Sequence, residues 1–336
     1  MKLPAEKVSR LRSAYAGQGV CVTGGAGFIG GHLVDALVSM GANVRVIDDL
    51  SNSTLEHLAG LIELEPERVR FVHGSILDDQ AIAEAVDGCQ CIFHLGAVGS
   101  VPKSIEAPQR TWSVNATGTV RVLEAARRAG VGRVVLAASS SAYGDQPQLP
   151  KVETMLPRPL SPYAVSKLAG EQLLSAWSHC YGLSTVSLRY FNIFGPRQSA
   201  DSAYAAVVAA FTKALLAGEA PTIYGDGSQT RDLTFVSNAV LATLLAGAST
   251  AKLQGQVMNV GTGRRVSILE LATILAQQCG VPHVQPVFQP PRAGDVKDSL
   301  ADITLAKQLL GYEPVATLED GLAETVEWFR RVMAGA

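Results

Sequence analysis

Strand and helix patterns that alternate along the chain predict an α/β protein with a parallel sheet. Runs such as "GVCV", "CIFH" and "RVVLAA" are almost wholly apolar, and helical patterns such as "ATGTVRVLEAARRAG" lie between runs of this kind. Strands have such runs when helices cover both faces of their sheet. A glycine-rich turn after the first run, "TGGAGFIG", is typical of a Rossmann-type, doubly wound sheet that binds a dinucleotide.

The elements follow one another in a regular order along the first part of the chain. Six strands are predicted, within residues 19–24, 43–50, 69–76, 89–97, 133–144 and 184–195. From about Phe194 the alternation loosens into "APTIYGDG", "TFVSN" and "VMNVGTG", which indicates a smaller α/β substrate lobe interleaved with the end of the sheet. The predicted division is an N-terminal helical extension outside the core (1–16), a dinucleotide-binding core (17–193) and this lobe (194–336).

Composition excludes several classes of function. The 336 residues carry a net charge of −2 and no basic block, which argues against a nucleic-acid partner. The longest apolar run, "AVLATLLAGA", is too short to span a bilayer, so no membrane partner is predicted. Five scattered cysteines favour a reduced cytoplasm. Cys89, Cys91 and His94 come nearest to a metal cluster, but their buried-strand pattern favours core packing, and no metal is predicted.

The turn "TGGAGFIG" places Gly24, Gly27 and Gly30 between a strand and a helix. Glycines there allow the backbone to approach a diphosphate, which the free N–H groups of the helix N-terminus bind. The next strand ends in Asp48 and Asp49. A carboxylate at Asp48 would bind the adenosine ribose hydroxyls and repel a 2′-phosphate, so NAD is the predicted cofactor rather than NADP.

Tyr163 and Lys167 stand one helical turn apart in "SPYAVSKLAGEQLL", and therefore on one helix face. A ring packed on a lysine stem would be an ordinary surface pair. A phenol beside an ammonium is also a proton-transfer pair. The serines of "SSS" close the fifth predicted strand, at the sheet edge where ligands bind in such folds. Together with the glycine turn, these residues favour a catalytic site.

With these motifs the chain resembles the extended short-chain dehydrogenases/reductases, specifically the nucleotide-sugar epimerases. The resemblance covers residues 18–329 and is greatest to the UDP-N-acetylglucosamine 4-epimerases. The glycine turn and Tyr-x-x-x-Lys are common to the superfamily, whereas "ASSSAYGDQPQLPKVE", "LRYFNIFGPRQ", "GDGSQTRD" and "GDVKDSLADI" are more specific. The implied reaction is NAD-dependent C4 epimerisation of a UDP-hexose through a transient 4-keto sugar, with UDP-N-acetylglucosamine and UDP-N-acetylgalactosamine as the expected pair.

The resemblance also implies roles for the catalytic residues. Tyr163 is expected to take the proton of the sugar 4-hydroxyl, its pKa lowered toward neutrality by Lys167 and the cationic nicotinamide. Ser139 is expected to hydrogen-bond the 4-oxygen, and Lys167 to hold the nicotinamide ribose. NAD is expected to be tightly bound and not consumed. The implied cofactor-binding residues are Gly24, Gly27, Phe28, Ile29, Gly30, Asp48, Asp49, Asn52, Ser53, Ser75, Ile76, Ala97, Tyr163 and Lys167.

The UDP-sugar is expected to be held firmly at its nucleotide end and loosely at its sugar end. The implied substrate-binding residues are Ser100, Ser140, Ser141, Asn192, Phe211, Tyr224, Arg231, Arg292, Asp295 and Ser299. Arginine suits the diphosphate because its fork of donors matches the phosphate oxygens, and Phe211 and Tyr224 would face the base. Ser299 is expected to leave room for an N-acetyl group that a tyrosine would exclude, although this serine could instead cap a following helix.

Several positions depart from neighbouring branches of the family. Ser140 and Ser141 stand where 4,6-dehydratases have Asp and Glu, and the loop "GAVGSVPKS" lacks the glutamate of the decarboxylases, so neither reaction is expected. Ser75 replaces the aspartate that usually contacts the adenine amino group. Phe211 stands where the most similar relatives tend to have tryptophan.

Two alternatives to the acetylated substrate stay open. One is a 4-epimerase for UDP-glucose and UDP-galactose or for a UDP-uronic acid. The other is a non-catalytic NAD-sensing protein on the same fold, although such proteins typically lose the Tyr–Lys pair. A homodimer through a four-helix bundle is also expected, because the helices around 117–129 and 163–179 carry apolar residues on more than one face.

Overall fold

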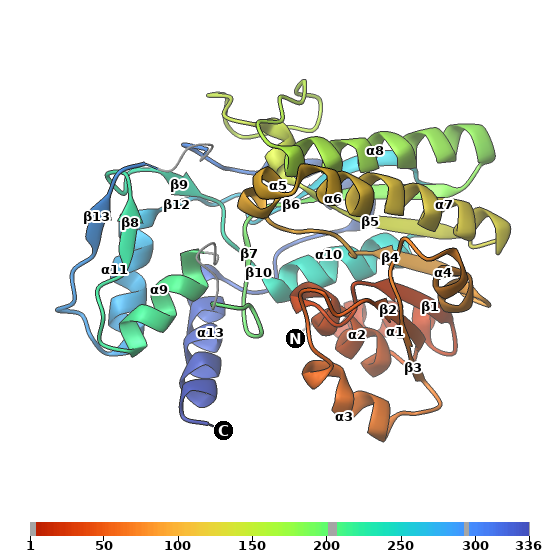
Figure 1. The fold of residues 1–336 in the computed structure, drawn as a ribbon, viewed down its shortest axis with the longest axis horizontal. Helices are drawn as coiled ribbons and strands as arrows, with labels where there is room; N and C mark the ends of the chain where they lie inside the picture. The colour runs from red at the N-terminus through yellow and green to blue at the C-terminus, as the bar shows by residue number, and fades with distance from the viewer. Residues whose placement is uncertain (1–4, 201–206, 292–295, 336) are drawn as a thin grey trace.

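A seven-stranded parallel sheet forms the centre of the computed structural model, which describes residues 5–200, 207–291 and 296–335 (Figure 1). The strand order is β11-β6-β5-β4-β1-β2-β3. The order reverses between β1 and β4, where a crevice for ligands forms at the carboxyl ends of the strands. The predicted doubly wound sheet is confirmed. Its strands are β1 (Gly19–Thr23), β2 (Asn43–Asp48), β3 (Val69–His73), β4 (Cys91–His94), β5 (Arg133–Ser139), β6 (Ser184–Tyr190) and β11 (Gln254–Val260).

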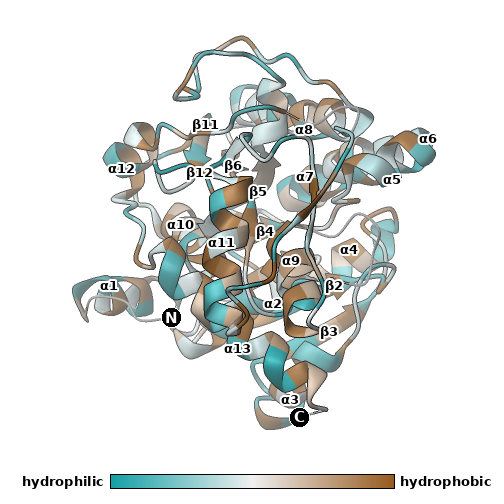
Figure 2. Ribbon diagram, turned by 90° about the vertical axis from the view of Figure 1, so that its left-hand side faces the viewer, coloured by the Kyte–Doolittle hydropathy of each residue, from teal (hydrophilic) through white to brown (hydrophobic). Residues whose placement is uncertain are grey.

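Helices cover both faces of the sheet because successive strand side chains point to opposite sides. Cys21 and Ile92 belong to the hydrophobic cluster under one helical layer, and their neighbours Val22 and Phe93 belong to the cluster under the other. Figure 2 shows the hydrophobic residues concentrated in the central strands and in the inward faces of the surrounding helices. One layer contains α2 (Phe28–Ser39), α3 (Glu56–Leu64) and α10 (Val236–Ala248), and the other contains α4 (Asp79–Val86), α7 (Gly118–Arg128) and α8 (Pro162–Tyr181).

The N-terminal segment forms a helix, α1 (Ala5–Tyr15), that is part of the core. Leu11 and Tyr15 are buried in the main hydrophobic cluster, and the Tyr15 hydroxyl donates a hydrogen bond of 2.6 Å to the Leu244 carbonyl of α10. The expectation that this helix stands outside the core is therefore wrong. The helix is mostly polar, and its buried residues are Leu11 and Tyr15, one helical turn apart.

A second lobe lies beside the carboxyl edge of the sheet, to the left in Figure 1. The chain enters it at β7, returns to the sheet for α10 and β11, and enters it again. The stretch "VMNV", predicted as part of the lobe, is therefore the edge strand β11. The lobe contains α9 (Val207–Leu216), α11 (Ile268–Cys279), α12 (Thr304–Leu310), α13 (Leu318–Met333) and the strand pairs β7/β10 (Ile193–Phe194, Thr234–Phe235), β8/β13 (Thr222–Tyr224, Val287–Gln289) and β9/β12 (Thr230–Arg231, Val266–Ser267).

Two short helices and a π-helical turn follow β4. The helices are α5 (Val101–Glu106) and α6 (Pro108–Trp112), and the π-helical turn at Ser113–Thr117 joins α6 to α7. Such turns occur often at functional sites. Here the turn directs the buried Asn115 side chain to the backbone N–H and C=O of Val98, at 2.8 and 3.2 Å. The loop after β4 is thus held in place by the helix that follows it.

Candidate active site

The glycine turn between β1 and α2 has a shape that only glycine permits. Gly24 has φ +69°, and a Cβ there would lie 2.7 Å from the backbone nitrogen of Gly96. A Cβ on Gly30 would lie 2.1 Å from the carbonyl oxygen of Gly24. Helix α2 begins at Phe28, and its N-cap, Gly27, has no side chain to cap it. The first-turn N–H groups, which include those of Phe28, Ile29 and Gly30, are therefore suited to a diphosphate.

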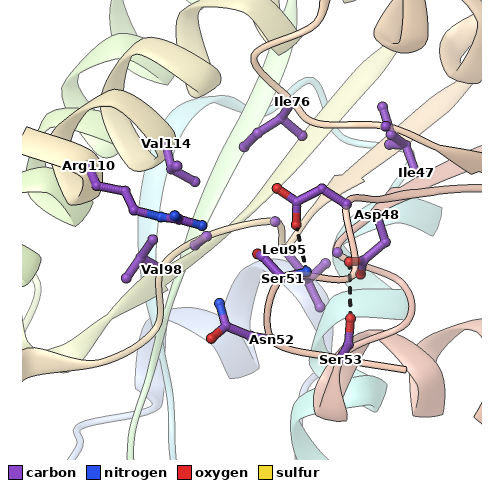
Figure 3. Close-up of a pocket in the computed structure, with 16 residues that line it drawn as sticks. Ile47, Asp48, Ser51, Asn52, Ser53, Ile76, Leu95, Val98, Arg110 and Val114 are labelled. Atoms are coloured by element: carbon purple, nitrogen blue, oxygen red, sulfur yellow. Dashed lines mark hydrogen bonds between the residues drawn. The ribbon is translucent and has the colours of Figure 1, made fainter. Parts of the chain in front are cut away.

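Asp48, at the end of β2, is held in one orientation by three hydrogen bonds. Its Oδ2 accepts a hydrogen bond from the Ala26 N–H at 3.0 Å, and its Oδ1 accepts from the Leu50 N–H at 2.9 Å and the Ser53 hydroxyl at 3.1 Å. Asp48 also lines the pocket beyond the glycine turn (Figure 3). A fixed carboxylate in this place fits ribose hydroxyls, and the residues present therefore fit NAD.

The pocket in Figure 3 brings together most of the predicted cofactor-binding residues. Gly24, Gly27, Asp48, Asp49, Asn52, Ser53, Ile76 and Ala97 line it. The sequence missed Ile47, Ser51, Gly74, Leu95, Gly96, Val98, Arg110 and Val114, which also line it. Most of these flank predicted residues at strand ends and could have been found there. Arg110 and Val114 come from a helix and turn packed over the pocket, and no local motif marks them.

Two predicted cofactor-binding residues are hydrogen-bonded to other parts of the protein. The Asn52 side-chain oxygen accepts a hydrogen bond of 2.8 Å from the Lys103 ammonium. The Ser75 hydroxyl accepts the Leu77 N–H at 3.3 Å, within its own turn, while the adjacent Gly74 and Ile76 form the pocket wall. Asn52 is thereby tied to α5, and Ser75 stays a predicted contact of the adenine.

The predicted catalytic residues meet at the carboxyl end of β5. Ser139 ends that strand, and its Oγ accepts hydrogen bonds from the Ser141 hydroxyl at 2.8 Å and the Ser141 N–H at 3.2 Å. Tyr163 lies in the first turn of α8, close enough to Ser139 for that side chain to favour its phenolate form. Lys167, one turn further, donates to the Ala137 carbonyl of β5 at 2.9 Å. The spacing in the sequence and the strand end thus combine into one site.

Burial controls the charge state of this group. It raises the pKa of Tyr163, and the nearby Ser139 side chain opposes that shift. It lowers the pKa of Lys167 to about 8. Without NAD, desolvation of the phenolate dominates, and the predicted lowering of the Tyr163 pKa, which includes the nicotinamide charge, stays a prediction for the NAD-bound enzyme. A cation placed in contact with Tyr163 acts in the opposite direction, and the nicotinamide ring of NAD is such a cation.

His94 lies buried at the end of β4, between two threonine hydroxyls. Its Nδ1 is 2.7 Å from Thr23 Oγ1, and its Nε2 is 3.0 Å from Thr119 Oγ1. Thr119 donates its own proton to the Asn115 carbonyl at 2.6 Å, so the network assigns the ring proton to Nε2. Burial and the nearby Lys167 charge lower the pKa of His94 to about 3, and the ring is neutral. It joins β1, β4 and the turn that holds Asn115.

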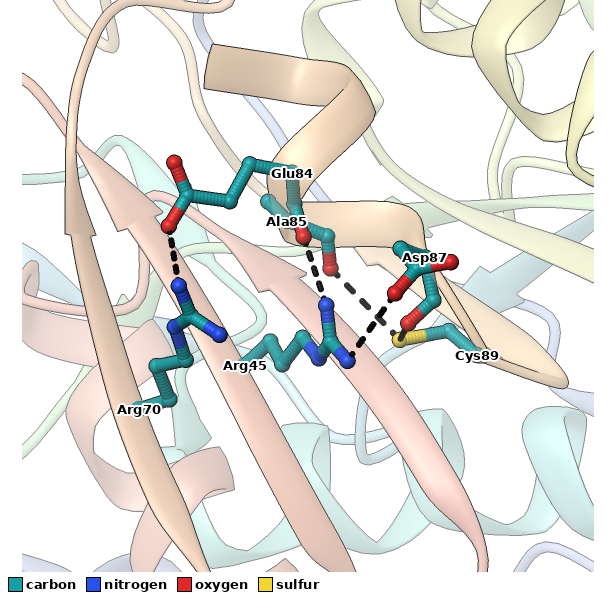
Figure 4. A network of polar contacts seen from close by, with 6 residues as sticks. All are labelled: Arg45, Arg70, Glu84, Ala85, Asp87 and Cys89. Carbon is teal, nitrogen blue, oxygen red and sulfur yellow. Dashed lines mark hydrogen bonds and ion pairs between the residues drawn. The ribbon is translucent and has the colours of Figure 1, made fainter.

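The cysteines near His94 are packed as core residues. Cys89 Sγ donates weakly to the Ala85 and Asp87 carbonyls, in a network where Arg45 contacts the Asp87 carboxylate and the Glu84 carbonyl (Figure 4). Burial raises the pKa of Cys89 to about 11 and that of Cys91 to about 12, which keeps both as thiols. Within residues 5–200, 207–291 and 296–335, no three His, Cys, Asp or Glu side chains are grouped so as to hold a metal ion.

The second lobe is joined to the sheet by the buried carboxylate of Asp232. Its Oδ1 accepts hydrogen bonds from the Thr262 N–H at 2.9 Å and hydroxyl at 2.7 Å. Its Oδ2 accepts from the Gly263 N–H at 3.0 Å and the Ala301 N–H at 3.1 Å. Burial raises the pKa of Asp232, and these four donors oppose the shift. One side chain therefore ties together three segments that are distant in sequence.

Three predicted substrate-binding residues lie around this junction. Asn192 Nδ2 donates to the Asp232 carbonyl at 3.0 Å and to the Ser299 hydroxyl at 3.2 Å. Arg231, in β9, donates to the Lys297 carbonyl at 3.1 Å. The alternative role of Ser299 as a helix cap is wrong, because the next helix begins at Thr304 and has Ile303 as its N-cap. The side chain of Ser299 instead faces Asn192.

The remaining predicted substrate-binding residues lie in different parts of the structure. Ser140 and Ser141 form the 3-10 turn after β5, and Tyr224 ends β8. Ser100 caps α5 by accepting the Lys103 N–H at 3.3 Å. Phe211 is 3 % exposed and belongs to the main hydrophobic cluster, which favours a packing role over contact with a base. Arg292 and Asp295 lie outside the described residues.

A buried ion pair behind the catalytic helix was not predicted. Glu171, one turn after Lys167, accepts two hydrogen bonds of 2.8 and 2.7 Å from the Arg189 guanidinium of β6. The guanidinium carbon lies 4.5 Å from the centre of the Tyr143 ring, and the Tyr143 hydroxyl donates to Asn259 Oδ1 at 2.7 Å. Because Tyr143 ends the turn that carries the serines, the pair connects that turn to α8.

Comparison with known proteins places the chain in a family. Residues 20–261 match the NAD dependent epimerase/dehydratase family. The chain is 43 % identical over 311 residues to the UDP-glucose 4-epimerase of Mycolicibacterium smegmatis, a match that covers 92 % of this chain and 97 % of that protein. Among solved structures, the UDP-N-acetylglucosamine 4-epimerase from Methanobrevibacter ruminantium M1 in complex with UDP-N-acetylmuramic acid has a TM-score of 0.89 at 35 % identity, over 95 % of this chain and 100 % of that one.

A third similar structure contains the cofactor. The Thermus thermophilus UDP-glucose 4-epimerase in complex with NAD has a TM-score of 0.82 at 35 % identity, over 93 % of this chain and 99 % of that one. Among the described residues, no helix combines the length and apolar character needed to cross a membrane. The chain therefore belongs to the NAD-dependent epimerase/dehydratase family and is an NAD-dependent enzyme of the UDP-sugar 4-epimerase type.

Proposed function

We propose that this enzyme interconverts UDP-N-acetylglucosamine and UDP-N-acetylgalactosamine at C4. The observation that carries the proposal is the small side chain of Ser299, which lies 3.2 Å from Asn192 at the junction of the lobe and the sheet. A small residue there leaves volume for an N-acetyl group beside the sugar. The similar Methanobrevibacter ruminantium enzyme, a UDP-N-acetylglucosamine 4-epimerase, supports the same choice.

UDP-glucose and UDP-galactose are the second candidate pair. The similarity to the Mycolicibacterium smegmatis UDP-glucose 4-epimerase favours them. A pocket that accepts an acetylated sugar can also accept the smaller sugar that lacks the acetyl group. A UDP-uronic acid is the third candidate, and it would need a cation for its carboxylate near the sugar.

The catalytic residues follow from their positions around β5. The chemistry that NAD supplies, when bound along the glycine turn, is removal of the hydride from C4 and its return to the opposite face of the sugar. Tyr163 accepts the proton of the 4-hydroxyl and gives it back after the 4-keto sugar has turned. Ser139, whose side chain lies near the Tyr163 hydroxyl, holds the 4-oxygen. Lys167 is held by the Ala137 carbonyl, where its ammonium stabilises the phenolate and binds the nicotinamide ribose.

The lobe is proposed to hold the nucleotide end while the sugar turns. Arg231 and Arg292 bind the diphosphate, Asp295 and Asn192 complete that end of the site, and Tyr224 faces the base. In this division residues 17–193 bind mainly NAD and residues 194–336 bind mainly the UDP-sugar, with α10 and β11 returned to the sheet. We place the enzyme in the cytoplasm because all five cysteines are free thiols.

Interconversion of a panel of UDP-sugars tests the proposal. Purified enzyme is incubated with UDP-N-acetylglucosamine, UDP-glucose and UDP-glucuronic acid, and the products are separated by chromatography. Interconversion of the acetylated pair with a kcat/KM at least equal to that for UDP-glucose supports the proposal. No turnover of the acetylated pair contradicts it. Ultraviolet absorbance of reduced nicotinamide is also followed during turnover. Its appearance indicates an enzyme, whereas a sensor that only binds NAD would not reduce it.

A homodimer is proposed through the helical layer around α8. Ile105, Trp112 and Val165 are 61 %, 49 % and 42 % exposed, and Trp112 and Val165 line the same groove. Exposed apolar side chains grouped in this way mark an interface, and a second copy of the chain with the same face would bury them. Light scattering at micromolar concentration should give the dimer mass, and Trp112→Glu should shift it toward the monomer. A monomeric mass for the wild type contradicts the proposal.

A further inference from the structure

The wall of the NAD pocket carries an arginine that the proposed mechanism does not use. Two carboxylates, Asp48 and Asp49, line the pocket, and Arg110 is the cation among its lining residues. Figure 3 shows the Arg110 side chain reaching from α6 into the pocket, with its guanidinium beside Val98. In the part of the chain that the structure describes, no acidic side chain forms an ion pair with Arg110. Its charge is therefore available to a ligand.

The position of Arg110 within the pocket indicates which part of NAD it meets. The diphosphate is expected at the glycine turn, and the adenosine ribose at Asp48. Beyond Asp48 the wall becomes apolar, formed by Gly74, Ile76, Val98 and Val114. Val114 follows Arg110 by one helical turn, and both side chains point into this apolar end (Figure 3). The apolar side chains at this end have the chemistry that suits an adenine ring.

We propose that Arg110 binds the adenosine half of NAD by laying its planar guanidinium over the adenine ring. Guanidinium is planar and weakly hydrated, and it stacks favourably on aromatic faces. Val98 and Val114 supply apolar contacts beside it. The neighbouring Ser75 hydroxyl is already occupied by the Leu77 N–H. Arg110 is thus a cofactor-retention residue, whichever UDP-sugar the enzyme accepts.

Release of NAD from the purified holoenzyme measures this contact directly. The release rate is followed by exchange of bound NAD for isotopically labelled NAD. Arg110→Ala should release NAD roughly threefold to thirtyfold faster, the range expected for one cation–π contact. Arg110 is exposed, so its truncation should not disturb folding. Arg121→Ala is the matched control, because Arg121 pairs with Asp79 at 2.8 Å and is not among the residues that line the pocket. An unchanged rate in Arg110→Ala overturns the proposal.

Two further comparisons distinguish stacking from attraction to a phosphate. Calorimetry on the full-length protein stripped of NAD gives affinities for ADP-ribose and for adenosine, and Arg110→Ala should weaken both by a similar factor. Arg110→Lys keeps the charge and loses the plane, so its affinities should lie between those of the wild type and Arg110→Ala. Full retention of affinity in Arg110→Lys, or a loss seen for ADP-ribose but not for adenosine, would each overturn the adenine contact.

Discussion

Around the glycine turn, the cofactor half of the site is formed by backbone segments in direct contact. Gly24, Gly30 and Gly96 approach one another so closely that a single Cβ would collide. Around Asp232, the substrate half is joined by side-chain hydrogen bonds between segments distant in sequence, including Thr262 and Ala301. The first half tolerates no added atom. The second depends on one carboxylate.

This difference follows from what each half must do. NAD stays bound through turnover, so a rigid cradle of backbone N–H groups suits it. In the proposed mechanism the sugar turns between the two hydride transfers, so its surroundings need to hold the substrate firmly only at the nucleotide end. Changes in the two halves should therefore separate NAD retention from UDP binding, and a change at the boundary should affect neither.

The largest effect is expected at that boundary, in Tyr163→Phe. The change removes the proton-accepting oxygen and keeps the ring volume, so kcat should fall by roughly 10²–10⁴-fold. Bound NAD, measured after denaturation, and the affinity for UDP should stay at wild-type values. A kcat close to that of the wild type would remove Tyr163 from the role of base.

Gly30→Ala should weaken NAD binding without weakening UDP binding. The added Cβ would lie 2.1 Å from the Gly24 carbonyl oxygen, and the backbone must shift to accommodate it. We expect NAD affinity to fall by about tenfold to hundredfold, in line with the usual cost of overpacking. UDP binding by calorimetry should be retained. Gly60→Ala on α3 is the control, since a Cβ there meets nothing within 4 Å. Equal NAD affinity in both variants would contradict the close-contact explanation.

Ser299→Tyr tests whether the size of this side chain selects between the two substrates. A tyrosine would occupy the volume beside Asn192, and kcat/KM for UDP-N-acetylglucosamine should fall about tenfold to hundredfold while that for UDP-glucose is spared. Ser299→Ala removes the hydroxyl without adding bulk and should leave the ratio of the two substrates unchanged. If the ratio does not move in Ser299→Tyr, Ser299 does not control substrate size.

A smaller effect is expected from Asp232→Asn, which weakens the junction itself. The amide can no longer accept from all four donors, and its NH₂ group faces backbone N–H groups. Two of the four accepted hydrogen bonds are lost, so UDP affinity should fall by at least about tenfold, while NAD content is retained. Asp226→Asn, on an exposed turn of the same lobe, is the control. Loss of NAD in Asp232→Asn would show that the halves are coupled.

The cofactor half was largely predictable because its information is local. The glycine turn, the acidic end of β2 and the Tyr163–Lys167 spacing are each written in a few consecutive residues. The apolar runs predicted the strands, and the strand ends predicted that those residues lie at one edge of the sheet. The substrate half was predicted through resemblance, which named Asn192, Arg231 and Ser299, and the structure brings these three around one junction. Phe211, also predicted there, is buried in the main hydrophobic cluster.

By itself, the sequence determined the parallel sheet, the glycine turn and the placing of Tyr163 and Lys167 on one helix face, because periodicity and turn chemistry act over one or two turns of chain. Tertiary structure alone decided that Glu171 pairs with Arg189, that Asp232 gathers three segments, and that Arg110 enters the NAD pocket. Each of these contacts joins residues whose neighbours carry no motif. They arise because packing helices on a twisted sheet brings distant side chains into a water-poor space, where unpaired charges and donors must find partners.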